Sequence, residues 1–177
     1  MKKFLFSGYA LPVLMLVCII MFLSVNVPYW DDYSAILGYF SHPFPDRLSH
    51  LADFHNEHRI LTARATFELI YQILGRFDFQ ICMGVGATIL LAYAALWGWQ
   101  FKIASPRGLR LYLPCFWLIV SFIQYENLCW AMTAVSNIPV HFWALLSCIL
   151  AARGKSKICF AGSIGCALFA SFSTGGG

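Results

Sequence analysis

Residues 28–78, PYWDDYSAILGYFSHPFPDRLSHLADFHNEHRILTARATFELIYQILGRFD, form the only long polar segment of an otherwise apolar sequence. The segment contains seven of the eight acidic residues and four of the five histidines. Apolar runs precede and follow it. The chain therefore divides into a first hydrophobic segment (residues 1–27), a polar loop (residues 28–78) and a hydrophobic remainder (residues 79–177).

The composition excludes an ordinary soluble domain. Hydrophobic residues make up 60% of the chain and charged residues 11%, with a mean hydropathy of +0.70. Soluble domains have about 25% charged residues. At roughly 20 residues for each membrane-spanning helix, the length predicts an all-α, polytopic transmembrane protein with about five spans. No basic cluster alternates with aromatic residues, so we expect no nucleic-acid partner.

Five apolar runs are the candidate spans. The first follows a basic N-terminus and is too long for the core of a signal peptide, so we interpret it as a retained helix that ends at Pro28. The third has only about 13 residues and needs neighbouring residues to cross a bilayer of about 30 Å. The runs are Phe4–Val27, Phe79–Phe101, Leu111–Ile123, Trp130–Ala152 and Ile158–Phe172.

The charges predict the orientation. With the N-terminus in the cytoplasm, eight of the twelve basic residues lie on the cytoplasmic side and all eight acids lie outside, as the positive-inside rule requires. This predicts a multi-pass protein of the cell inner membrane, with residues 28–78 and 124–137 on the non-cytoplasmic face. The basic residues placed inside are Lys2, Lys3, Lys102, Arg107, Arg110, Arg153, Lys155 and Lys157.

The polar loop is predicted to contain amphipathic surface helices. Asp31 or Asp32 can cap a short first helix, whose apolar residues would lie on the membrane surface. They are Tyr33, Ile36, Leu37 and Phe40. Two prolines end that helix, and a second helix is expected over about 47–74, with an Arg64–Glu68 pair on its polar side and Gly75 as its stop.

Asp31 and Asp32 follow the first span directly and are the candidate catalytic residues. A carboxylate at the membrane surface can accept a proton from a hydroxyl that attacks an activated sugar. Alternatively, the two carboxylates can help to hold a divalent cation. The simplest alternative is structural, with Trp30 as an interfacial aromatic residue and one acid as a helix cap.

Trp30-Asp31-Asp32 after the first helix, then His55-Asn56-Glu57-His58-Arg59, then Gln124-Tyr125-Glu126-Asn127 with Trp130, resembles the N-terminal portion of GT-C-class polytopic glycosyltransferases. The resemblance implies a polyisoprenyl-linked sugar donor and a catalytic carboxylate in the first external loop. It assigns the catalytic role to Asp31 and Asp32. Under it, Glu57, His58 and Arg59 would bind the donor phosphates, with a bidentate contact from Arg59.

Two other groups of residues have open interpretations. His50, Asp53, His55, Glu57 and His58 could share a metal on a helix, but the spacing favours a hydrogen-bonded polar face without metal. A second group could line a sugar pocket, with Trp130 as an apolar platform, or could be only an aromatic belt and a turn; it consists of Tyr125, Glu126, Asn127 and Trp130. His141 lies inside the fourth span, where a polar residue is a functional candidate or a hydrogen-bond partner for a neighbouring helix.

Three functions remain open on the sequence. The leading hypothesis is a membrane glycosyltransferase, or the N-terminal portion of one, that takes a sugar from a lipid-linked donor outside the cytoplasmic membrane. The alternative is a non-catalytic membrane subunit that binds a partner membrane protein through the polar loop. A small transporter ranks third, because the spans lack the acidic residues of an ion path. Whether the chain is an enzyme by itself is left open.

Overall fold

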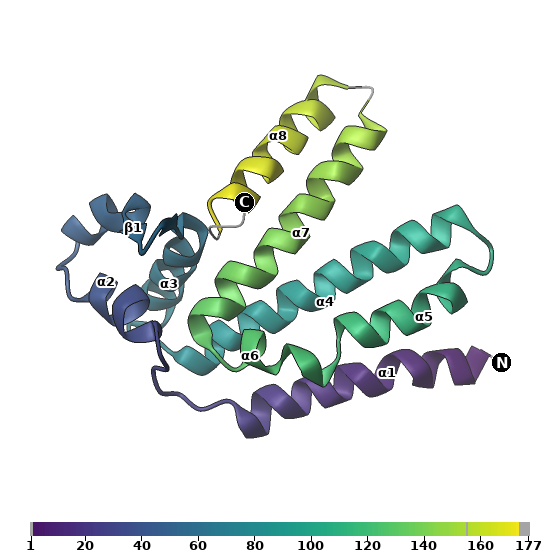
Figure 1. The fold of residues 1–177 in the computed structure, drawn as a ribbon, viewed down its shortest axis with the longest axis horizontal. Coiled ribbons are helices and arrows are strands. Elements are labelled where there is room, and N and C mark those ends of the chain that lie inside the picture. The colour runs from purple at the N-terminus through teal and green to yellow at the C-terminus, as the bar shows by residue number, and fades with distance from the viewer. Residues whose placement is uncertain (1, 155, 174–177) are drawn as a thin grey trace.

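The computed structural model describes residues 2–154 and 156–173, which fold almost entirely as helices (Figure 1). Long helices lie side by side, and a small polar unit from the first loop sits at one end of them. The helical elements are α1 (Lys2–Cys18), η1 (Ile19–Leu23), η2 (Tyr33–Leu37), α2 (Gly38–Phe40), η3 (Asp46–Ala52), α3 (Leu61–Leu74), α4 (Phe79–Ala104), α5 (Gly108–Ile119), η4 (Phe122–Gln124), α6 (Tyr125–Leu128), α7 (Ala131–Arg153) and α8 (Lys157–Ser171).

Within the described residues, four helices are long and apolar enough to cross a membrane: Leu5–Leu23, Phe79–Ala104, Gly108–Leu128 and Ala131–Arg153. The structure therefore confirms the predicted all-α class, and its four long apolar helices are compatible with a membrane protein. The third helix is longer than its 13-residue apolar run, because α5, η4 and α6 follow one another from Gly108 to Leu128. Residues 125–127, expected in a turn, therefore lie in the short helix α6 at its end.

The expected fifth span is α8, an apolar helix of 15 residues that is shorter than the other four. It runs back along α7 (Figure 1), and Ser147 and Ser163 exchange hydrogen bonds between the two helices. Its end meets the polar unit, where the Thr62 amide donates to the Phe172 carbonyl at 3.2 Å. The predicted basic loop between α7 and α8 includes Lys155, which lies outside the described residues.

Small residues bring α4 and α7 close together. A Cβ atom added to Gly86 would lie 2.5 Å from the Ala134 carbonyl oxygen, so only glycine fits there. Close approach through small residues is typical of helix pairs in membranes. At the start of α4, the Asp78 side chain accepts a hydrogen bond from the Ile81 amide and caps the helix. These contacts fix where the polar loop rejoins the long helices.

The prediction of one helix over 47–74 is wrong. The 3₁₀ helix η3 ends at Ala52, Asp53 is extended with ψ 154°, and a small hairpin follows before α3 begins. Its strands are β1 (Phe54–His55) and β2 (His58–Arg59), paired antiparallel. Asn56 supplies the left-handed conformation of the turn, φ 53°, which asparagine tolerates well. Gly75 ends α3 with φ 69°, as predicted.

The polar unit packs around its own core on the end of α4 and α7. Ala35, Ile36, Ile60, Ala63 and Phe67 are buried together with residues of both long helices, including Phe79, Cys82, Ala131 and Val135. Ile36 is fully buried inside the protein, whereas Tyr33 and Leu37 are exposed. The predicted apolar stripe of the first loop helix is therefore divided between the core and the surface.

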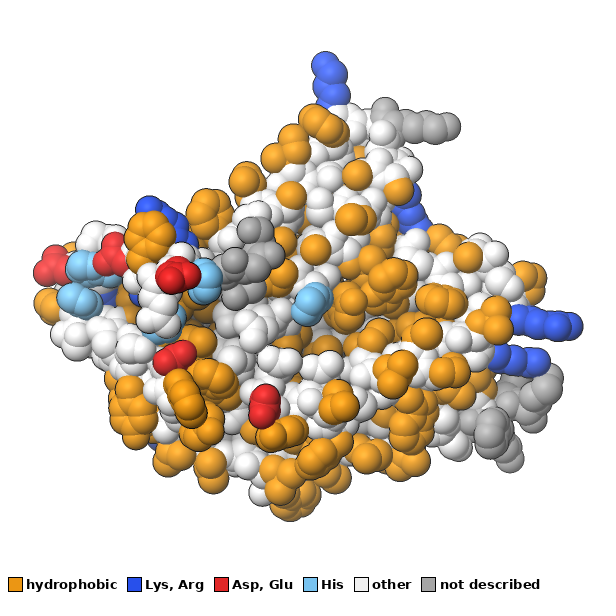
Figure 2. Space-filling model, viewed as in Figure 1, with side chains coloured by type: hydrophobic (Ala, Val, Ile, Leu, Met, Phe, Trp, Pro, Cys, Tyr) orange, Lys and Arg blue, Asp and Glu red, His pale blue; other side chains and the backbone are white. Residues whose placement is uncertain are grey.

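Charged side chains separate along the molecule (Figure 2). Most acids and histidines gather on the polar unit, where some Arg side chains also lie, and further Lys and Arg side chains project from the far ends of the long helices. Hydrophobic side chains cover the surface between these two ends. This is the pattern that the sequence predicts for a protein whose acidic and basic ends lie on opposite sides of a membrane.

Candidate functional site

The turn Tyr29–Asp32 holds Trp30 in an unusual backbone conformation. Trp30 has φ 48°, which is uncommon for a bulky residue. The turn is closed by the Asp32 amide, which donates to the Tyr29 carbonyl at 3.0 Å, and by the Tyr29 amide, which donates to Asp32 Oδ2 at 3.0 Å. Trp30 is 70% exposed despite its size. Such strain is found at functional sites, where the surrounding structure enforces it.

Asp32 ties this turn to the start of α7. Its carboxylate is fully buried, and Oδ1 accepts a hydrogen bond from the Met132 amide at 2.9 Å. Burial raises the pKa of Asp32, and the hydrogen bonds from Tyr29 and Met132 offset part of that rise. The indole N–H of Trp130 also lowers the pKa of Asp32, although its geometry is not that of a hydrogen bond. Asp32 therefore caps α7 rather than the short loop helix for which a cap was predicted.

Asp31 has a different environment. It is half-buried, and its carbonyl accepts from the Ser34 and Ala35 amides at 3.1 and 2.7 Å. Among the described residues, no hydrogen bond is made to its carboxylate, which leaves both oxygens for a ligand. The side chain is close enough to His55 for its charge to act on that imidazole. Of the two predicted carboxylates, Asp31 is thus the one with free acceptor capacity.

An aromatic pocket of about 580 Å³ opens beside this turn and is lined by Tyr29, Trp30, Tyr125, Glu126, Cys129 and Trp130. The Tyr29 and Trp130 rings meet edge to face, with centroids 5.8 Å apart. Tyr125 donates a hydrogen bond to Glu126 Oε1 at 2.9 Å. The structure therefore brings three of the four residues of the predicted sugar pocket together with the segment before Asp31. The fourth of these, Asn127, lines a different cavity.

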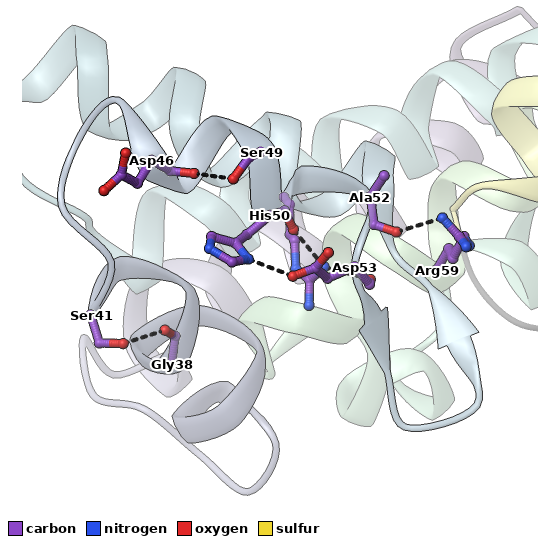
Figure 3. A network of polar contacts seen from close by, with 9 residues as sticks. Gly38, Ser41, Asp46, Ser49, His50, Ala52, Asp53 and Arg59 are labelled. Atoms are coloured by element: carbon purple, nitrogen blue, oxygen red, sulfur yellow. Dashed lines mark hydrogen bonds and ion pairs between the residues drawn. The ribbon is translucent and has the colours of Figure 1, made fainter.

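The predicted phosphate-binding residues lie on the hairpin and do not line this pocket. Glu57, His58 and Arg59 are exposed. Arg59 donates to the Ala52 carbonyl at 2.9 Å (Figure 3), and its guanidinium lies 4.4 Å from the Phe54 ring centroid. These two contacts hold the Arg59 side chain on its own unit. Any contact between these residues and a ligand in the aromatic pocket requires a ligand long enough to reach both.

The predicted helical face of histidines is wrong, because His55 and His58 face each other across the hairpin. His55 is buried and His58 is exposed. His50 instead pairs with Asp53, with Nδ1 2.5 Å from Oδ2 (Figure 3), and stacks on His42. Among the residues that the structure describes, no group of three His, Cys, Asp or Glu side chains is placed to hold a metal ion.

Two buried arginines organise the polar unit, and sequence reasoning assigned their partners wrongly. Glu68 pairs with Arg47 at 2.8 Å, not with Arg64. Burial raises the pKa of Glu68, but hydrogen bonds from Arg47 and Gln72 outweigh it and hold the pKa below its usual value. Arg64 donates to the His50 and Asp53 carbonyls at 2.9 and 2.6 Å. The misassigned helix over 47–74 concealed both contacts.

His55 is the residue of this region that the predicted site omitted. His55 is 8% exposed, and its Nε2 has no hydrogen-bond partner within the described part of the chain. Burial lowers the pKa of His55; the charge of Asp31 raises it, and Arg64 and His58 lower it further. Burial therefore favours the neutral imidazole, although the charge of Asp31 acts in the opposite direction. Its place in the His-Asn-Glu-His-Arg motif was the available signal.

Comparisons with protein-family models, curated proteins and solved structures find no match to this chain. Its function therefore has to be argued from the site itself.

Proposed function

We propose that this chain is a polytopic membrane glycosyltransferase of GT-C type, or the N-terminal portion of one, that transfers a sugar from a polyisoprenyl-linked donor on the non-cytoplasmic face of the inner membrane. In this proposal the N-terminus is cytoplasmic and α8 contributes to a fifth span. The polar unit lies among the lipid headgroups on the non-cytoplasmic face of the inner membrane. The separation of basic and acidic ends supports this orientation.

The observation that carries the proposal is the aromatic pocket lined by Tyr29 and Trp30, the two residues that precede Asp31. Two polar segments nearly 100 residues apart meet there, at the ends of the long helices. Aromatic rings offer a platform for the apolar face of a sugar, and Glu126 and Tyr125 offer hydrogen-bond partners for its hydroxyls. A pocket at the end of a spanning helix is reached by a donor whose lipid tail stays in the membrane.

In the proposed reaction Asp31 is the general base. It accepts the proton of the acceptor hydroxyl while the hydroxyl oxygen bonds to the anomeric carbon. The bond from that carbon to the phosphate oxygen breaks, and the lipid phosphate leaves with the bonding electrons. Glu57, His58 and Arg59 are proposed to contact the donor phosphates. Asp32 holds the turn that presents Asp31.

The test is sugar transfer by the protein, in its full-length form, reconstituted in liposomes with polyprenyl-phosphate-linked hexoses. Trp130→Leu and Glu126→Gln should raise KM for the donor without loss of protein from the membrane. The matched control is Phe160→Leu, an exposed aromatic residue of α8 outside the pocket. Donor affinity that is unchanged in both pocket variants would remove the pocket from the proposal.

A non-catalytic, partner-binding subunit is the second candidate. The observation that favours it is a group of exposed apolar side chains on the polar unit, outside the four long helices: Phe44, Leu48 and Phe54. Under the proposal above these side chains enter the headgroup region of the membrane. In the alternative they contact a partner membrane protein, and the unaltered chain shows no transfer with any lipid-linked donor.

A further inference from the structure

A second cavity shares no lining residue with the aromatic pocket. It has a volume of about 270 Å³ and is formed by α4, the helix from α5 to α6, and α7. Its polar lining comes from five side chains, none of which carries a fixed charge; the lining residues are Leu90, Tyr93, Leu118, Ile119, Gln124, Asn127, Asn137, Ile138 and His141.

Three amides in this cavity form one hydrogen-bonded chain. Asn137 Nδ2 donates to Asn127 Oδ1 at 3.2 Å, and Asn127 Nδ2 donates to Gln124 Oε1 at 3.1 Å. Ser136 continues the chain by donating to Asn137 Oδ1 at 3.3 Å. Each amide nitrogen carries two protons, so the chain fixes the side-chain orientations and still leaves donors free. Gln124 Nε2 donates to no described residue.

Tyr93 and His141 complete the cavity from the facing helices. Their ring centroids are 6.2 Å apart, and neither the Tyr93 hydroxyl nor the His141 ring makes a hydrogen bond within residues 2–154 and 156–173. His141 lies ten residues beyond Ala131, the start of α7. At a rise of 1.5 Å per residue this is roughly 15 Å along the helix, about half of a hydrocarbon core of about 30 Å.

Free polar groups at that depth are costly unless something satisfies them. The chemistry of the lining selects the occupant. With no charged side chain it does not compensate a phosphate or an ammonium group, but its amides, imidazole and phenol can donate to and accept from hydroxyls. The volume is that of about nine water molecules, which is enough for one hydroxylated ring. The apolar residues Leu118 and Ile138 border the same space.

We infer that this cavity binds a neutral, hydroxyl-rich ring with an apolar tail, such as the head of a neutral glycolipid, through Asn127, Asn137 and His141. The ring hydroxyls replace the missing hydrogen-bond partners of the amide chain and of the two aromatic side chains. The tail lies along the bordering apolar residues. The inference does not depend on catalysis, because the Asp31 turn is not part of this cavity.

The experiment uses the full chain in lipid nanodiscs with a photoreactive octyl glucoside that carries a diazirine in its alkyl chain. Labelling should fall on peptides of α5 and α7 that border the cavity, and excess methyl glucoside should reduce it. Asn137→Leu should lower labelling at least tenfold. Asp31→Asn should leave it unchanged, so that this result stays separate from the test of transfer. Thr88→Leu, an exposed polar residue of α4 outside the cavity, is the matched control.

Two comparison probes decide the ligand class. Octyl phosphate and octanol with the same diazirine should label the cavity at least tenfold less than the glucoside does. Equal labelling by octanol would show an apolar groove without sugar recognition and would overturn the inference. Equal labelling by octyl phosphate, or no effect of Asn137→Leu while the protein remains folded by circular dichroism, would overturn it as well.

Discussion

The carboxylate of Asp32 and the amide of Met132, 100 residues apart in the sequence, are joined by a hydrogen bond of 2.9 Å. Through this bond the turn that carries Trp30 and Asp31 is fixed to the N-terminus of α7. The same contact places Tyr29 beside Trp130. The first loop and the α6–α7 junction therefore form one surface, and the two adjacent carboxylates have different roles in it.

Removing the Asp32 carboxylate should destabilise the protein. Asp32→Ala leaves the Tyr29 and Met132 amides without their acceptor, and an unsatisfied buried donor costs about 1–3 kcal/mol. Asp32→Asn keeps an acceptor oxygen and should cost less. The free energy of unfolding in mixed detergent micelles measures this, with Ser34→Ala, an exposed hydroxyl in the next turn, as control. Equal stability of Asp32→Ala and Ser34→Ala would show that the hydrogen bonds of Asp32 to the Tyr29 and Met132 amides do not stabilise the fold.

The Arg47–Glu68 ion pair should be essential for the polar unit. Both residues are buried, and Glu68 also accepts from Tyr39 and Gln72. Arg47→Met should cost about 3 kcal/mol, because it leaves a buried carboxylate without its cation. Adding Glu68→Gln to Arg47→Met should restore part of this.

The control for the ion pair is Arg76→Met, since the Arg76 side chain is 77% exposed and lies 3.6 Å from Asp78. An exposed pair contributes little, so we expect a small loss of stability. Chemical denaturation followed by tryptophan fluorescence compares the variants. If Arg47→Met were no more harmful than Arg76→Met, the buried pair would have no structural importance.

Acid should loosen the hairpin through His55. Its pKa is lowered in the folded protein, mainly by burial, from the ordinary value of 6.5. The unfolded state therefore binds the proton first as the pH falls. The stabilising contribution is complete above pH 6.5 and is lost as the pH falls towards the folded pKa.

Hydrogen exchange of the hairpin and α3 amides, corrected for intrinsic rates, should show less protection at about pH 5.5 than at about pH 7.5. His55→Gln should remove most of that difference. An unchanged pH dependence in His55→Gln would assign it to another group.

The hairpin should lie on the non-cytoplasmic side of the membrane. A cysteine at Glu57, which is exposed at the hairpin turn, should react with an impermeant thiol reagent in intact cells. Glu57 is preferred to Asn56, whose φ of 53° disfavours other side chains. The seven native cysteines have to be replaced first. A cysteine at Pro106, between α4 and α5, should react only after permeabilisation; the opposite pattern would reverse the orientation.

The long helices could be predicted from the sequence, because the length of an apolar run and the positions of the charges are read directly along the chain. The polar loop could not be predicted as well. The run from Arg47 to Leu74 has helical periodicity. However, Arg64 donates hydrogen bonds to the His50 and Asp53 carbonyls and so stabilises the interruption of the helix, which no local sequence pattern reveals. The topology predicted only that the segments of Tyr29 and Trp130 lie on the same face, and the contact between the two rings was not predicted. The division of roles between Asp31 and Asp32 depends on a contact with α7, which adjacency in sequence cannot show.

Asp31 is the proposed catalytic carboxylate, and its most direct test is sugar transfer from a polyprenyl-linked donor by Asp31→Asn in the full-length protein. Transfer should fall by about 10²–10⁴-fold, the usual cost of losing a general base, at unchanged abundance in the membrane. Asp32→Asn, measured in parallel, should lose abundance or stability and keep transfer per folded molecule. Full transfer by Asp31→Asn would contradict the account.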